Sequence, residues 1–293
     1  MKGGNNLNTH NKYKKIIGKI FIYLALLVIS FLFILPFWQI ISTSLKTFLE
    51  TTEYPQKFFP KVPQWKNYYY AFVKNADIWP VFLWLKNTVF TTLMVVIGNV
   101  LSGLFIAYGF ARFNGRGKNI WFMLILSTML IPVHSTLVPL FMVYKAFNWY
   151  NTFLPIIVPP FFGFAVYIFL LRQFIMGIPK ELDEAATIDG ASPVGILFKI
   201  IVPLARPSVI AVGVMCFIAA WGDFFTPLIF LSDIKKYTIS VGVSIMQSQM
   251  RMNLTDTHLI ACVITVVTLP SLIIFFAAQK YFVSGLTLGA VKG

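Results

Sequence analysis

Long stretches without a charged residue are the feature that most constrains this chain. A helix needs about 20 apolar residues to cross the roughly 30 Å hydrocarbon core of a bilayer. Six runs are long enough, and only the fifth contains an Asp, Glu, Lys or Arg: 20–41, 87–111, 119–144, 146–171, 207–231 and 257–279. Each is continuously apolar instead of alternating between polar and apolar residues, which favours helices over barrel strands. The sequence therefore predicts an all-α polytopic membrane protein with six transmembrane helices.

Basic residues predict the orientation and the divisions of the chain. Lysines cluster before the first run, and cytoplasmic flanks of membrane helices hold positive charge. We expect a cytoplasmic N-terminus, a retained first helix and, after six crossings, a cytoplasmic C-terminus. The expected divisions are an N-terminal segment 1–19, a first helix 20–41, an outer loop 42–86, a five-helix core 87–280 and a tail 281–293. The net charge of +14 is spread over the loops, which indicates contact with membrane lipid and not with nucleic acid.

The outer loop carries several prolines and a cluster of aromatic residues, Trp65, Tyr68, Tyr69 and Tyr70. Tryptophan and tyrosine gather at the edges of bilayers. One interpretation is therefore an interfacial anchor. The other is a docking surface for an external partner.

The segment 178–207 reads IPKELDEAATIDGASPVGILFKIIVPLARP and connects two expected membrane helices. Pro179 suits the first turn of a helix, and the acidic residues Glu181, Asp183 and Glu184 suit its positive end. Gly190 can end this helix in the left-handed conformation. Ser192 and Pro193 then form an N-cap and first position. The pattern predicts two short helices joined by a glycine turn.

The first of these helices has a face that suits a partner. Glu184 and Ile188 are four residues apart and share that face, while Ala185 and Ala186 keep the neighbouring surface small. Carboxylates offer charge-assisted contacts to a basic surface. An acidic helical loop without a partner explains the same pattern equally well.

The run EAATIDGASPVGILFKIIVPLARP closely resembles the coupling loop, or EAA loop, of permease subunits of binding-protein-dependent ABC importers. The segments IPVHSTLVPLF (131–141), WGDFFTPL (221–228) and the end of the chain resemble the carbohydrate branch, which includes the maltose-transporter type. The resemblance implies a bacterial inner-membrane location and ATPase docking through Glu184, Ala185 and Ala186, with Gly190 in the turn. The neighbouring docking candidates are Glu181, Asp183, Ile188, Asp189 and Pro203. Val202 stands where the motif usually has leucine.

The resemblance also implies partners: a homologous permease, two ATPase subunits, an external sugar-binding protein and a carbohydrate substrate. The chain has no G-x-x-x-x-G-K-[ST] run to bind nucleotide phosphates, since Gly115–Lys118 lacks the first glycine and the hydroxyl residue. We therefore expect no catalytic residue and no bound cofactor here, with ATP and Mg²⁺ on the partner. The histidines show no H-E-x-x-H pattern, so no metal site is expected.

Two ionisable residues inside expected membrane helices are candidates for a translocation cavity. They are His134 and Asp223. Such groups are expensive in a bilayer and often functional. A buried hydrogen bond to a backbone carbonyl explains His134 more readily than a proton relay does, and contact with water or a neighbouring amide explains Asp223 as well as a cavity role does. The alternative functions are an ion-gradient-coupled solute carrier and a membrane assembly factor, although a carrier would usually place several carboxylates in repeated halves.

Overall fold

The computed structural model describes residues 5–253 and 256–290, with side chains for 16–249 and 256–279, and every regular element in these ranges is a helix. The all-α prediction is confirmed. The chain divides into two compact units, Met1–Ala71 with Met250–Thr265 and Phe72–Gln249 with Val266–Gly293. The ends of the predicted terminal segments, 1–4 and 291–293, lie outside the described residues.

The first unit contains the long helix α1 (Asn5–Ser44) and the short helices α2 (Phe48–Thr52) and α3 (Lys66–Tyr69). Asn67 holds the chain after α1 by donating from Nδ2 to the carbonyls of Ser44 and Lys46, at 2.9 and 2.8 Å. Thr47 and Glu50 form a capping box at the N-terminus of α2. The predicted outer loop is thus a folded segment held by buried polar groups.

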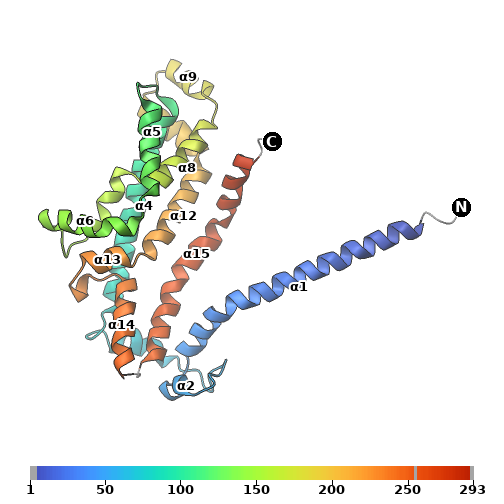
Figure 1. The fold of residues 1–293 in the computed structure, drawn as a ribbon, viewed down its shortest axis with the longest axis vertical. Helices are drawn as coiled ribbons and strands as arrows, with labels where there is room; N and C mark the ends of the chain where they lie inside the picture. The colour runs from blue at the N-terminus through green and yellow to red at the C-terminus, as the bar shows by residue number, and fades with distance from the viewer. Residues whose placement is uncertain (1–4, 254–255, 291–293) are drawn as a thin grey trace. The chain divides into compact units, whose positions relative to one another are not determined.

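The second unit is built around α4 (Val81–Arg112), which packs against α8 (Ala165–Met176) and α12 (Arg206–Trp221) (Figure 1). Its remaining helices include α5 (Lys118–Ser127), α6 (Val133–Ala146) and α13 (Phe225–Phe230). Both α14 (Ile239–Asn253) and α15 (Thr257–Ala290) have residues in the two units. Small residues let α4 and α8 approach: Gly103 lies beside Leu171, where an added Cβ would come within 3.2 Å. The core of this unit therefore lies along α4.

Four helical stretches in the described residues are long and apolar enough to cross a membrane, and two bent pairs would bring the number to six. The four are Ile16–Ser44, Val81–Arg112, Leu154–Met176 and Thr257–Gln279. The bent pairs are Lys118–Leu130 with Val133–Ala146, at 99°, and Pro193–Leu204 with Arg206–Trp221, at 83°. Length and composition thus allow between four and six crossings.

Three predicted runs are not single straight helices, and proline or asparagine explains the first two breaks. The run 119–144 bends at Ile131, which is extended because it precedes Pro132. The run 146–171 begins with a turn in which Asn148 and Asn151 have positive φ, so α7 (Leu154–Ile157) starts later than expected. The run 207–231 is divided between α12 and α13. Each of these three predicted runs is therefore divided into more than one helical segment.

Candidate functional site

The helix α9 (Glu181–Ile188) ends as its sequence predicts. Gly190 has φ +81°, its N–H donates to the carbonyl of Thr187 at 3.0 Å, and the N–H of Ala191 donates to that of Ala186 at 2.9 Å. These two bonds form a Schellman motif, in which glycine relieves the steric penalty of the left-handed conformation. The predicted glycine turn is confirmed, and it frees the chain to change direction after α9.

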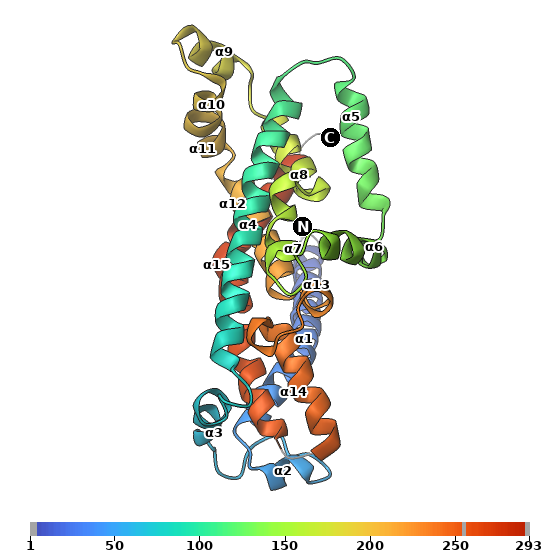
Figure 2. The same ribbon diagram turned by 90° about the vertical axis from the view of Figure 1, so that its left-hand side faces the viewer.

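The second short helix begins at the predicted cap. Ser192 Oγ accepts from the N–H of Gly195 at 3.2 Å, and Pro193 occupies the first turn of α10 (Pro193–Ile196). The helical path continues through the π turn Leu197–Ile201 into α11 (Val202–Leu204). Figure 2 shows α9, α10 and α11 following one another ahead of α12. Pro203 is exposed on this path.

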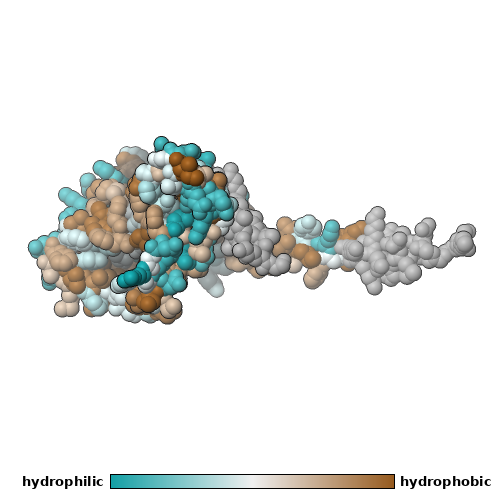
Figure 3. Space-filling model, turned by 90° about the horizontal axis from the view of Figure 1, so that it is seen from above, coloured by the Kyte–Doolittle hydropathy of each residue, from teal (hydrophilic) through white to brown (hydrophobic). Residues whose placement is uncertain are grey.

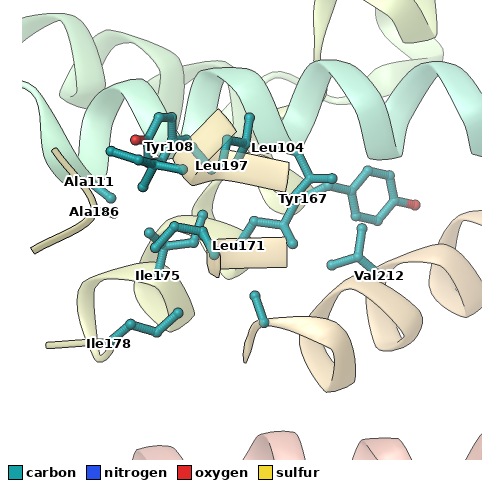
Figure 4. Packing of buried hydrophobic residues seen from close by; sticks show 14 of the residues in the cluster. Leu104, Tyr108, Ala111, Tyr167, Leu171, Ile175, Ile178, Ala186, Leu197 and Val212 are labelled. Atoms are coloured by element: carbon teal, nitrogen blue, oxygen red, sulfur yellow. The ribbon is translucent and has the colours of Figure 1, made fainter. Parts of the chain in front are cut away.

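One face of α9 lies against the core. Ala186 is buried and belongs to the same hydrophobic cluster as Tyr108 and Ala111 of α4 (Figure 4). Leu197 and Ile201 of the following helical path are buried in this cluster as well. The segment 178–207 is therefore packed onto the rest of the second unit by apolar contacts from both of its helical parts.

An ion pair fixes the same face of α9 to the end of α4. Arg112 Nε lies 2.6 Å from Asp183 Oδ2, and the two side chains are only 5% and 15% exposed. Arg112 Nη2 also donates to the carbonyl of Ile178 at 3.0 Å. Arg112 thus holds both the chain before α9 and the first turn of α9. The sequence indicated Arg112 only as a basic residue beside a membrane helix, because a long-range pair leaves no local pattern.

The opposite face of α9 is free of intramolecular packing. Glu184 and Ala185 are exposed, and Ile188 is 87% exposed. Glu181 and Asp189 are exposed at the two ends of the helix. Figure 3 looks onto the end of the second unit that carries α9 and shows hydrophilic residues with hydrophobic ones between them. We call Glu181, Glu184, Ala185, Ile188 and Asp189 the α9 outer face.

The two candidate cavity residues line one cavity in the second unit, with a volume of about 500 Å³. His134 comes from the first turn of α6, and its ring lies 4.8 Å from that of Phe225, between centroids. Asp223 follows α12, and its Oδ1 accepts from the N–H of Thr226 at 3.2 Å. The bend before α6 and the break after α12 therefore bring both residues to the same space.

Sequence reasoning missed the other polar groups of this cavity. The threonines and the asparagine among them come from α4, α6, α13 and the chain before α14: Thr91, Asn99, Thr136, Thr226 and Thr238. Asn99 and Thr91 lie inside an apolar run, where a single polar side chain is an ambiguous signal. No group of three His, Cys, Asp or Glu residues suited to a metal occurs among the described side chains.

Residues 99–288 match the sequence family described as binding-protein-dependent transport system inner membrane component. The arabinooligosaccharides transport system permease protein AraQ of Halalkalibacterium halodurans is 32% identical over 92% of this chain and 96% of its own length. The melibiose/raffinose/stachyose import permease protein MelC of Bacillus subtilis is 33% identical over 88% of this chain and 91% of its own length.

A solved structure shares the fold. It is that of a bacterial ABC transporter involved in the import of the acidic polysaccharide alginate, with a TM-score of 0.79, 21% sequence identity, and coverage of 92% of this chain and 98% of that one. The match to the family covers more than half of the chain and agrees with the helical architecture described above. The chain belongs to the family of inner membrane components of binding-protein-dependent transport systems.

Proposed function

We propose that this chain is a permease subunit of an ATP-driven importer of sugars, in particular oligosaccharides, and that it forms half of the pathway through the membrane. The similar proteins named above transport arabinooligosaccharides and melibiose, raffinose and stachyose. In this proposal the chain pairs with a homologous permease, two ATPase subunits and an external sugar-binding protein. ATP and Mg²⁺ bind to the ATPases, and both termini of the chain are cytoplasmic.

The observation that carries the proposal is the division of α9 into a fixed face and a free face. The α9 outer face presents three acids, a small residue and an apolar side chain that is 87% exposed. Carboxylates make charge-assisted contacts with basic groups of a partner, and the small residue lets another backbone approach closely. We assign this face to the ATPase. Asp183 and Ala186, which lie inward, hold the helix in place.

The fixed face gives the outer face a mechanical connection. Arg112 ends α4, which packs along α8 and α12, so a force on α9 reaches three helices through an ion pair and packed side chains. Packed interfaces tend to switch between discrete arrangements instead of deforming continuously. We infer that closure of the ATPases moves α9 and these helices together, and that the cavity opens first to one side of the membrane and then to the other.

The cavity suits a sugar. Its wall combines aromatic rings, among them Tyr144, Phe164 and Tyr167, with the polar groups of Thr91, Asn99 and Asp223. Apolar walls with a few placed polar groups are typical of small-molecule sites. His134 and Asp223 are then contacts along the translocation pathway.

The test is co-purification of the ATPase with the permease complex carrying Glu184→Lys and Ile188→Asp together. Both side chains are exposed, and neither forms a hydrogen bond or ion pair with the described part of the chain, so the fold should remain. We expect recovery of the ATPase to fall at least tenfold and sugar uptake by cells to be lost, because the substitutions reverse a charge and remove an apolar contact.

A matched control makes the same changes of charge and polarity elsewhere. Asp77→Lys with Ile78→Asp alters two exposed residues in the turn before α4. The control should leave ATPase recovery unchanged. Normal recovery and uptake with the α9 variant would refute the docking assignment and favour uptake driven by an ion gradient.

A further inference from the structure

The cavity wall has one carboxylate and no permanent cation. Among the described residues that line the cavity, Asp223 is the one carboxylate, His134 is the one imidazole, and neither lysine nor arginine occurs. The wall of this half of the pathway therefore supplies a negative charge without a fixed basic counter-charge. An arriving ligand has to tolerate that charge.

Two acceptor groups of the wall lack hydrogen-bond donors. Asp223 Oδ1 accepts one hydrogen bond, from the N–H of Thr226, and Asp223 Oδ2 accepts none within the described part of the chain. Asn99 is buried, its Nδ2 donates to the carbonyl of Val95 at 3.1 Å, and its Oδ1 has no partner in the described part of the chain. An ionised carboxylate and an amide oxygen are acceptors only. Leaving a buried acceptor without a donor costs free energy.

Neutral and acidic sugars differ in just these respects. A hydroxyl group can donate to Asp223, whereas the carboxylate of a uronic acid can only accept. Like charges also repel more strongly where protein replaces water, and salt screens them less there. The transporter of similar fold described above imports an acidic polysaccharide, so the fold alone does not decide the sign of the ligand.

We propose that this cavity admits neutral, hydroxyl-rich saccharides and disfavours saccharides with carboxylate or sulfate groups, an inference that rests on the proposed function. Asp223 is the specificity-determining residue. The proposal concerns the preference of the pathway itself, which is distinct from any selection by an external binding protein.

The experiment measures binding to the purified complex of this chain with its partner permease and ATPases, without the binding protein. Equilibrium dialysis at low ionic strength compares a labelled galactose-containing trisaccharide with a galacturonate-containing one of equal length. We expect the neutral saccharide to bind at least tenfold more tightly to the wild-type complex. Asp223→Asn keeps an oxygen for the N–H of Thr226 and should reduce this ratio at least fivefold.

Two further variants sharpen the result. Asp233→Asn is the matched control, because Asp233 lies outside the cavity and its Oδ1 likewise accepts a backbone N–H, that of Lys235 at 2.9 Å. It should leave the ratio unchanged. Ala219→Lys places a base in the cavity wall and should improve binding of the acidic saccharide.

Equal binding of both saccharides by the wild type, or an unchanged ratio in both Asp223→Asn and Ala219→Lys, would overturn the charge preference and leave the proposed sugar transport intact. Binding of neither saccharide would overturn the inference together with the assignment of this cavity to sugar.

Discussion

The two ends of α4 both hold a distant segment of the chain, but they do so with different chemistry. At its start, Trp84 Nε1 donates to the carbonyl of Ile234 at 2.7 Å, and Asn87 Nδ2 donates to the carbonyls of Lys235 and Tyr237 at 2.9 and 3.0 Å. At its end, Arg112 holds α9 through the ion pair with Asp183. The first junction is neutral and the second is charged.

The difference has an energetic meaning. Neutral bonds from buried side chains to backbone satisfy groups that have no other partner, and each contributes about 1 kcal/mol. A buried ion pair adds little net stability, but loss of one partner leaves a charge without compensation. The start of α4 therefore stabilises a fixed loop, whereas its end makes the placement of α9 depend on a single pair.

The largest effect is expected from Asp183→Ala. Removal of the carboxylate leaves the nearly buried guanidinium of Arg112 unpaired, which should lower the free energy of unfolding by about 3 kcal/mol. Thermal unfolding of the purified complex measures this, and proteolysis of the chain just before α9 should become faster. The double variant Arg112→Met with Asp183→Leu should recover at least half of the loss. If the double variant were as unstable as the single one, the ion pair itself would stabilise the fold, and the cost of Asp183→Ala would not come only from an unpaired charge.

A comparable test of the neutral junction is Gly242→Ala. An added Cβ would collide with the indole of Trp84, which is fully buried and cannot move away. Overpacking of this kind costs about 2 kcal/mol. Gly213→Ala on α12 is the control, because there the nearest atom is 3.9 Å from the new Cβ. Equal melting temperatures for the two variants would show that the packing around Trp84 is loose.

Asn87→Ala removes both bonds to the segment before α14 and leaves two carbonyls to find other donors. We expect a loss of about 2 kcal/mol, smaller than that of Asp183→Ala because no charge is stranded. Denaturant unfolding of the complex is the measurement, and Asn75→Ala, in a turn of the same unit, is the control. A loss greater than that of Asp183→Ala would reverse the ranking of the two junctions.

The smallest effect is expected from Gly190→Ala. No atom lies within 4 Å of the added Cβ, so the only cost is that of a left-handed backbone, about 1 kcal/mol. Hydrogen exchange at the amides of Gly190 and Ala191 should become roughly fivefold faster, because about 1.4 kcal/mol changes an opening equilibrium tenfold. Gly190→Asn should exchange more slowly than the alanine variant, because asparagine tolerates this conformation. Identical rates in all three proteins would mean that the turn does not limit the end of α9.

Local signals carried much of the prediction. The caps at Ser192 and Gly190 depend on residues within a few positions of one another, and the structure has both. The apolar runs predicted helices, but the helices end at other residues than predicted, near Pro132 and after Trp221. The position of such a break depends on whether neighbouring helices can form hydrogen bonds with the backbone groups that it leaves unpaired.

By itself, the sequence determined that the chain is helical, that it is apolar enough for a membrane, and that a capped helix–turn–helix segment joins two of its parts. Only the tertiary structure decided that Asp183 pairs with Arg112 and leaves the α9 outer face free, and that His134 and Asp223 share a cavity. The physical reason is range. Caps and helix periodicity act over one or two turns, whereas an ion pair or a cavity wall joins residues that only packing brings together.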